Sequence, residues 1–283
     1  MDYRVIGSTE SGYPELLRRI PGTPPAQLFV AGDDRHMLPP AVAIVGTRDA
    51  TPYGLRIARQ LSTAFAKAGV SIISGMARGI DAAAHRAALD AGGRTVAVLG
   101  TGIDVPYPVA HRELHRALSE RACVVSESGP GVRAGPGAFP KRNRIIAGLA
   151  DATIVVEAGY KSGAIITANL AEQFQRIVAA VPGPIDSPAS RGCNELLRDN
   201  VQVIATIADA LGLVGIASQQ EQAPISLSEN DGRVWKVLAS GPLDPDAISI
   251  RTRLTTRECL TAITSLELGG YVEVLLTGEV RRR

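Results

Sequence analysis

Short apolar runs alternate with amphipathic segments along the middle of this chain. The runs are rich in β-branched residues, as buried strands are, and cover residues 42–45, 70–74, 95–99, 123–126, 153–157 and 177–181. Patterns with a helical period follow, directly or after a loop, near residues 54–68, 81–91, 110–121, 142–149, 164–174 and 194–200. This alternation predicts an α/β fold with a doubly wound, mostly parallel sheet and right-handed crossovers.

The two ends of the chain follow different patterns. Residues 1–40 contain a short amphipathic stretch, a proline-rich segment and a strand at 27–30, and we interpret them as a lead-in to a domain at 41–214. Residues 215–227 are polar, with a proline and no apolar period, which predicts a linker. Residues 228–283 are then expected to form a small separate domain.

The C-terminal domain is predicted to be helical with a wing. Its helical patterns and one following strand lie at residues 231–238, 244–250, 255–268 and 271–276. The third helix takes the place of a recognition helix, but Arg257 is its one basic residue. Direct reading of a major groove is therefore doubtful, and a protein-binding or dimer role is an equal alternative. Of three hypotheses for the function of the protein, one is a transcription regulator that acts through this domain.

Composition limits the possible partners and compartments. The net charge of +2, from 30 basic and 28 acidic residues, is too small to attract a polyanion in bulk, so a nucleic-acid site must be a local patch. Cys123, Cys193 and Cys259 lie far apart without C-x-x-C spacing, which argues against disulfides and a zinc knuckle. No stretch approaches the ~20 apolar residues of a membrane span. We expect a cytoplasmic protein without a metal.

Small residues mark the turns after several predicted strands. They include Gly46-Thr47-Arg48, Ser74-Gly75, Gly100-Thr101-Gly102, Ser126-Glu127-Ser128 and the turn from Gly159 to Gly163. In a parallel sheet these turns lie on one rim, where free backbone N–H groups at helix N-termini can bind phosphate. The alternative for any single turn is that a tight connection needs glycine anyway. The spacings of G-x-G-x-x-G and G-x-x-x-x-G-K-[ST] are absent, so no nucleotide cofactor is expected.

Residues 138–163 combine an aromatic side chain with a cluster of cations. Phe139 precedes Lys141, Arg142 and Arg144, and a buried strand then leads to a turn with Lys161 and Ser162. Cations beside an aromatic face suit a polyanion whose bases can stack, so a nucleic acid strand or a nucleotide is the first candidate ligand.

Two interpretations of Phe139 remain open. It can be a hydrophobic plug under its loop, since a lone phenylalanine is more often core than ligand. Alternatively, Pro136, Gly137 and Pro140 hold the loop extended and keep the ring available to stack on an unpaired base.

Other polar pairs have weaker functional interpretations. Asp81 with His85, and His111 with His115, stand at i and i+4 and could seed a metal site, but a helix-start role for Asp81 is the stronger explanation. A pair of strand-end carboxylates, Glu127 and Glu157, could serve hydrolysis, against a structural role in binding turn amides.

The ordered motifs resemble those of the bacterial DNA-processing protein A family (DprA, also called Smf). They are VAIVGTR, SGMARGIDAAAH, AVLGTGID with Tyr107-Pro108, Ser126-Glu127, FPKRNRIIAG, Glu157-Ala with Ser162-Gly163, and VPG. The similarity is dense from about residue 40 to 212, and SLELGGY near the C-terminus is similar to the winged-helix domain that many members carry. It implies an extended Rossmann-like domain with a small C-terminal winged-helix domain.

The resemblance also implies a function. Members are cytoplasmic, non-enzymatic recombination mediators that bind single-stranded DNA, form homodimers and load the RecA recombinase during natural transformation. The DNA-binding residues expected here are Gly46, Thr47, Arg48, Ser74, Gly75, Arg112, Phe139, Lys141, Arg142, Asn143, Arg144, Lys161, Ser162 and Gly163. Pro136 and Val109 stand where relatives often carry lysine, which leaves Arg133, Lys141 or Arg112 to supply that charge.

An enzyme is the second hypothesis. The expected fold resembles that of phosphoribohydrolases of the lysine decarboxylase-like group, and Glu157 before a glycine turn loosely resembles their P-G-G-x-G-T-x-x-E signature. The chain has no P-G-G-x-G-T, so a nucleotide phosphoribohydrolase ranks below the DNA binder.

Overall fold

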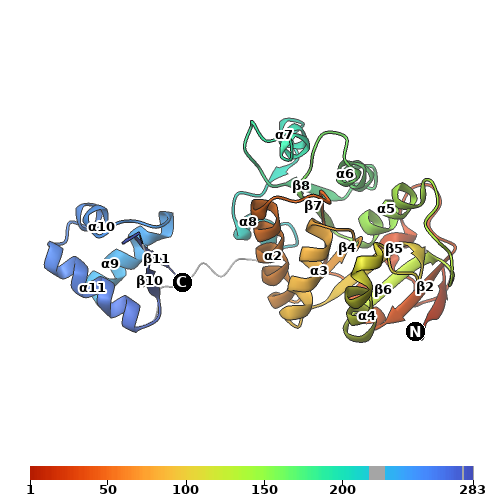
Figure 1. The fold of residues 1–283 in the computed structure, drawn as a ribbon, viewed down its shortest axis with the longest axis horizontal. Helices are drawn as coiled ribbons and strands as arrows, with labels where there is room; N and C mark the ends of the chain where they lie inside the picture. Colours follow the sequence, from red (N-terminus) through yellow and green to blue (C-terminus); the bar gives the residue numbers. More distant parts are fainter. Residues whose placement is uncertain (217–226, 276, 283) are drawn as a thin grey trace. The chain divides into compact units, whose positions relative to one another are not determined.

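The computed structural model describes residues 1–216, 227–275 and 277–282. The chain divides into two compact units, residues 1–218 and 219–283, and each is described here by itself (Figure 1). Among the described residues, no helix has the length and apolar character to cross a membrane.

The larger unit is built on a nine-stranded sheet with the order β1-β2-β6-β5-β4-β3-β7-β8-β9. The strands are β1 Arg4–Gly7, β2 Gln27–Gly32, β3 Ala41–Gly46, β4 Ser71–Ser74, β5 Thr95–Gly102, β6 Cys123–Ser128, β7 Ala152–Glu157, β8 Ile177–Ala180 and β9 Gln202–Val203. The strands from β6 through β5, β4, β3, β7 and β8 to β9 pair in parallel, while β1–β2 and β2–β6 are antiparallel. The predicted doubly wound, mostly parallel sheet is therefore confirmed.

Helices cover both faces of the sheet (Figure 1). They are α1 Glu15–Arg18, α2 Pro52–Lys67, α3 Ile80–Asp90, α4 Arg112–Arg121, α5 Ala138–Leu149, α6 Gly163–Gln173, α7 Arg191–Arg198 and α8 Ile207–Gly212. Side chains of α1, α5, α6 and α7 share one core cluster, and those of α2, α3 and α8 share another. The runs that sequence patterning identified are buried because helices flank each central strand on both sides.

The N-terminal segment is part of the sheet. β2 extends the strand expected at 27–30, and β1, which the apolar pattern did not indicate, pairs with it at the edge. Leu17 and Leu28 are fully buried, so the segment also contributes to the core.

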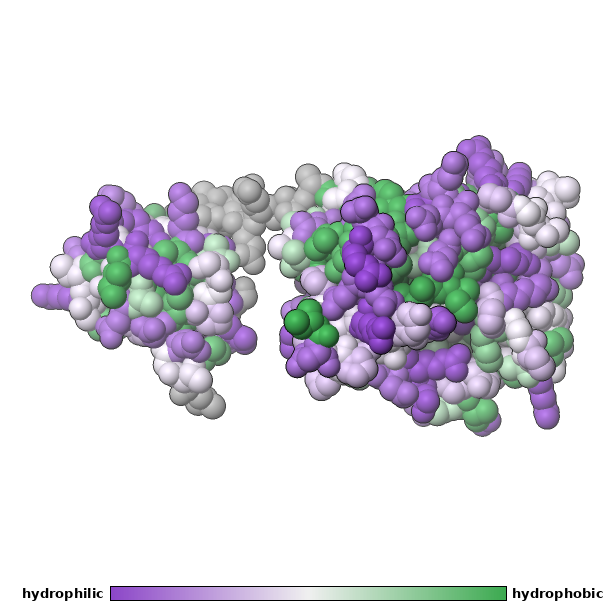
Figure 2. Space-filling model, turned by 90° about the horizontal axis from the view of Figure 1, so that it is seen from above, coloured by the Kyte–Doolittle hydropathy of each residue, from purple (hydrophilic) through white to green (hydrophobic). Residues whose placement is uncertain are grey.

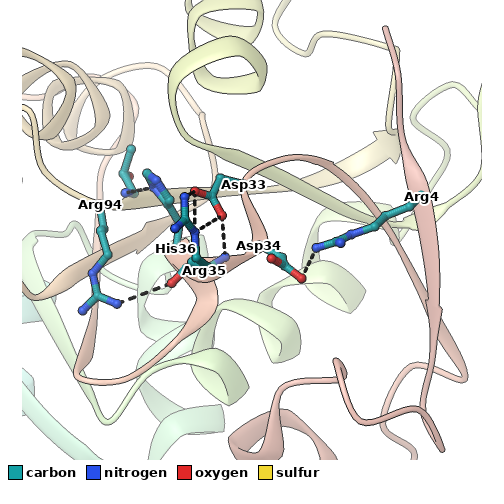
Figure 3. A network of polar contacts seen from close by, with 7 residues as sticks. Arg4, Asp33, Asp34, Arg35, His36 and Arg94 are labelled. Atoms are coloured by element: carbon teal, nitrogen blue, oxygen red, sulfur yellow. Dashed lines mark hydrogen bonds and ion pairs between the residues drawn. The ribbon is translucent and has the colours of Figure 1, made fainter.

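A network of polar contacts fastens this segment to the central strands (Figure 3). Arg4 forms an ion pair with Asp34. Arg94 donates hydrogen bonds to the carbonyls of Arg35 and Leu38. His36 Nδ1 accepts a 3.1 Å hydrogen bond from the Thr95 backbone N–H. This nitrogen therefore carries no proton, and the imidazole ring is neutral.

In its described residues, the smaller unit contains three main helices and a hairpin, as a winged helix does. Its elements are α9 Glu229–Val237, α10 Pro245–Thr252, α11 Thr256–Leu268, β10 Val272–Val274 and β11 Val280–Arg282. Thr255 and Glu258 form a reciprocal capping box that starts α11. The expected strand at 271–276 is β10, and its antiparallel partner β11 completes the wing.

Figure 2 shows hydrophilic residues over most of the visible surface, with hydrophobic residues exposed among them in small groups. The whole chain carries a net charge of only +2. A charged site must therefore be sought in the placement of individual side chains.

Candidate nucleic-acid interface

Two adjoining pockets lie at the carboxyl ends of the central strands, the edge where open α/β sheets bind ligands. Pocket A, of about 420 Å³, is lined among others by Thr47, Asn143, Ser162 and Gly163. Pocket B, of about 310 Å³, is lined among others by Gly75, Arg78, Thr101 and Tyr107. Arg48, Phe139 and Arg142 line both pockets and so form the wall between them.

Arg48 brings a free cation to this wall. It follows β3 in a turn where Thr47 N–H donates to the Glu157 carbonyl at 2.7 Å and Ile80 N–H to the Thr47 carbonyl at 3.3 Å. Gly79 has φ +74° and approaches this turn so closely that a Cβ would lie 2.3 Å from the Thr47 carbonyl oxygen. The Arg48 side chain is exposed and, within the described part of the chain, forms no ion pair.

Phe139 places an aromatic ring under that guanidinium. The Arg48 Cζ atom lies 5.5 Å from the ring centroid, within the range of a cation–π contact. The ring of Tyr107 lies 4.8 Å away, centroid to centroid, at 36°. Phe139 is half-buried and reaches both pockets, so its ring is neither a fully buried plug nor a freely exposed side chain.

The expectation of an extended loop around Phe139 is wrong. α5 begins at Ala138, four residues earlier than the helix predicted at 142–149. Gly137 supplies the left-handed N-cap residue with φ +76°. Pro140 falls in the first helical turn, where its missing N–H has no helical partner to lose.

Arg142 is buried and holds strand ends together. Its Nη1 donates a 2.8 Å hydrogen bond to the Gly75 carbonyl and another to the Val98 carbonyl. Burial lowers the pKa of the guanidinium to about 10, with the Asp81 charge acting in the opposite direction. The expected DNA-binding arginine therefore works, in this geometry, as a link from α5 to β4 and β5, although its surface lines both pockets.

Lys141 and Arg144 point to a different part of the surface. Both pair with Glu127, at 3.2 and 2.6 Å, and neither lines pocket A or pocket B. Lys141 remains exposed, whereas the Arg144 side chain is 18% exposed. Two of the cations of the FPKRNR segment are thus engaged by one carboxylate.

The turn before α6 forms the far side of pocket A. Lys161 has φ +53° and is exposed, and Ser162 is the N-cap residue of α6. The Ser162 Oγ atom is buried and, among the described residues, has no hydrogen-bond partner. Asn143 Nδ2 donates to the Gly163 carbonyl at 3.2 Å and so joins α5 to this turn. A hydroxyl without a partner, next to helix-start N–H groups, suits an anionic or polar ligand.

The remaining predicted residues divide into two groups. Gly46 lines pocket A and Gly75 lines pocket B. Ser74 lies beneath the site, where its buried hydroxyl donates to the Ile44 carbonyl at 2.7 Å. Arg112 lines a separate cavity near Asp104, so the structure does not bring it to the pockets.

Sequence reasoning missed two residues of this site. Arg78 is exposed, lines pocket B and lies 3.7 Å from Asp49 in an exposed ion pair. The Tyr107 ring contacts the Phe139 ring. In the sequence, the one sign of a role for Tyr107 was its place in the Tyr107-Pro108 motif.

The candidate carboxylates and histidines have structural partners. Glu157 accepts hydrogen bonds from the backbone N–H and hydroxyl of Thr51, at 2.8 and 2.6 Å, and thereby supports the start of α2. Asp81 accepts from the N–H groups of Gly75 and Ala77, and burial raises its pKa. Burial lowers the pKa of His85 to about 3. The part of the chain that the structure describes holds no group of three His, Cys, Asp or Glu residues able to bind a metal ion.

Comparison with known proteins identifies the family. Residues 4–215 match the model of DNA recombination-mediator protein A, and residues 218–275 match the DprA winged helix domain. A putative DNA processing protein DprA of Mycobacterium tuberculosis is 40% identical over 262 residues, which span 89% of this chain and 67% of that protein.

Solved structures agree with that match. DNA processing protein A from Streptococcus pneumoniae has a TM-score of 0.73 and 36% identity, with 76% of each chain covered. DNA processing protein A from Helicobacter pylori, described with a single-stranded DNA binding mode, has a TM-score of 0.68 and 29% identity over 75% of this chain and 95% of its own. The chain therefore belongs to the DNA recombination-mediator protein A (DprA) family and carries the winged-helix domain of that family.

Proposed function

We propose that this protein binds single-stranded DNA without sequence preference along the rim of pockets A and B. The observation that carries the proposal is the free Arg48 guanidinium 5.5 Å from the half-buried ring of Phe139. A phosphate can pair with the guanidinium while an unpaired base lies against the aromatic rings. The single-stranded DNA binding mode described for the Helicobacter pylori relative supports the same ligand class.

The geometry favours a single strand over a duplex. Stacking on Phe139 or Tyr107 requires the face of a base, and a duplex hides its base faces within the stack. Arg48 and Arg78 are exposed cations that line the pockets, and the aromatic rings beside them add base stacking to the phosphate contacts.

Beyond DNA binding, we propose that the protein acts as a homodimer in the cytoplasm and loads the RecA recombinase on incoming DNA in natural transformation, without enzymatic activity. Support for these steps comes from membership of the recombination-mediator family. The structural contacts of Glu127 and Glu157 give no support to the phosphoribohydrolase alternative.

The test compares Arg48→Ala with Arg112→Ala, a matched control that removes the same charge from an exposed arginine in another cavity. Binding of a fluorescent oligothymidylate is measured over a range of salt. Each lost phosphate contact lowers the log–log salt slope by about 0.7. We expect that change for Arg48→Ala alone, and wild-type protein should prefer the single strand to its duplex.

Equal slopes and affinities for wild type and a folded Arg48→Ala would remove Arg48 from the interface. For the later steps, RecA filament formation on protein-coated single strands should be faster with the wild-type protein present. Sedimentation should show a dimer.

A further inference from the structure

A second exposed aromatic ring lies farther along the same rim. Tyr160 belongs to the turn between β7 and α6 and is 54% exposed. Lys161 Nζ lies 5.0 Å from its ring centroid, and Arg191 Cζ, from the start of α7, lies 4.8 Å from it. Tyr160 does not line pocket A or pocket B, so it is not part of the site already described.

Packing does not account for this arrangement. A ring that remains more than half exposed buries little apolar area, and the fold gains little from it. Drawing two cations to one ring also brings like charges together, which costs free energy until an anion approaches. The Arg191–Glu195 ion pair, 3.3 Å and 64% exposed on the arginine side, holds that cation only weakly.

The backbone of the turn is held in place. Gly192 N–H, at the start of α7, donates a 2.8 Å hydrogen bond to the Ala158 carbonyl. A Cβ at Gly192 would lie 2.6 Å from the Gly159 carbonyl oxygen, so the two segments pack closely. Tyr160 and Arg191 are thus presented together by two elements in contact.

The order of strands in the sheet gives the direction in which a bound DNA strand would run along the rim. Tyr107 and Phe139 lie near the end of β5, Arg48 follows β3, and Tyr160 follows β7, in a sheet ordered β5-β4-β3-β7-β8. Strands lie about 4.8 Å apart, so β5 and β7 are about 14 Å apart across the sheet. An extended single strand that leaves pocket A past Ser162 would next meet Tyr160.

We propose that Tyr160 is a second base-stacking platform for single-stranded DNA, with Lys161 and Arg191 contacting the flanking phosphates. This inference rests on the proposed function and extends its binding footprint beyond the pockets toward β8 and α7. An aromatic face accepts any base, so the platform adds affinity without sequence preference.

The experiment uses the full chain and two oligothymidylates, of about five and about fifteen nucleotides, within the range of known single-strand footprints. Tyr160→Ser should weaken binding of the longer strand by about fivefold to 150-fold, the range of one lost stacking contact, and should change binding of the shorter strand little. Tyr160→Phe should bind normally. Tyr3→Ser, at another exposed tyrosine beside β1, is the matched control and should leave both affinities unchanged.

Two further readouts separate stacking from a structural role of the ring. In Tyr160→Trp, the new indole should be quenched by oligothymidylate, while the buried Trp235 gives a constant background. Arg191→Gln should lower the salt slope by about 0.7, and Arg198→Gln, at the other end of α7, should not. If the indole of Tyr160→Trp is not quenched and Tyr160→Ser binds the longer strand normally, Tyr160 is not a stacking platform.

Failure of the inference and failure of the proposed function have different signatures. If wild type binds and Phe139→Ala weakens both strands while Tyr160→Ser weakens neither, the pockets bind DNA and the platform is wrong. If wild type binds neither strand, the proposed function itself is wrong.

Discussion

Replacing Arg142 with methionine should destabilise the larger unit without changing the salt slope of DNA binding. Methionine keeps much of the length of the side chain, so the change removes the hydrogen-bond donors while limiting the cavity. The Gly75 and Val98 carbonyls would lose the Nη1 donor that now joins α5 to β4 and β5.

The expected magnitude follows from these contacts. A buried acceptor left without a partner costs about 1–3 kcal/mol. Two such acceptors are left, the Gly75 and Val98 carbonyls, and Asp81 loses the nearby positive charge that lowers its pKa against the effect of burial. Because the effects share one side chain, we expect about 3–5 kcal/mol in total, from a unit whose whole stability is of the order of 5–15 kcal/mol.

The assay is urea unfolding, monitored by tryptophan emission and by circular dichroism. The one tryptophan, Trp235, belongs to the smaller unit and is 8% exposed, so its emission follows the winged helix. Circular dichroism follows both units. With a slope of about 3 kcal/mol per molar, the circular dichroism midpoint of the larger unit should fall by about 1 to 1.7 M, and the tryptophan midpoint should stay unchanged.

A different result would assign Arg142 to the DNA-binding site. An unchanged midpoint, together with a salt slope reduced by about 0.7, would mean that the guanidinium binds phosphate and that its carbonyl contacts stabilise little. A fall of the tryptophan midpoint together with the circular dichroism midpoint would mean that the two units do not unfold independently.

Three further outcomes can be checked. Phe139→Ala should lower affinity for single strands by about 1–3 kcal/mol while Phe139→Trp binds nearly normally, with the salt slope of both unchanged; equal loss in both variants would refute stacking. Burial lowers the pKa of His85 from 6.5 to about 3, so unfolding takes up a proton in this interval: the stability present above pH 6.5 should fall by about 1.4 kcal/mol per pH unit toward pH 3. His85→Gln should lack that part of the slope, and parallel wild-type and variant curves in a pH series of urea unfolding would contradict it. A chain ending at residue 216 should fold and keep most of its oligonucleotide affinity, and loss of that affinity would place part of the interface in the winged helix.

The fold could be predicted because its determinants are local. Each central strand lies between two helical layers and is therefore apolar on both faces, which a run such as residues 152–157 shows directly. β1 and β9 were missed because short edge strands bury few side chains and so leave no apolar pattern. β11 was missed for a similar reason, since three residues carry almost no period.

The site was harder to predict than the sheet because it depends on where α5 starts. With Ala138 as its first residue, the helical period places Phe139, Arg142 and Asn143 on the pocket side. The same period directs Lys141 and Arg144 to Glu127. A count of charges in FPKRNR cannot make this distinction, because neighbouring cations look alike until the helix start is known.

The ends of the large sheet bear on how copies of this protein can assemble. β1 has four residues and β9 has two, so each edge offers few unpaired N–H and C=O groups to another chain. A dimer made by joining two sheets into one continuous sheet would gain little from such edges. The proposed homodimer should therefore meet through helices or loops, and native chains at high concentration should resist the open-ended strand pairing that leads to fibres.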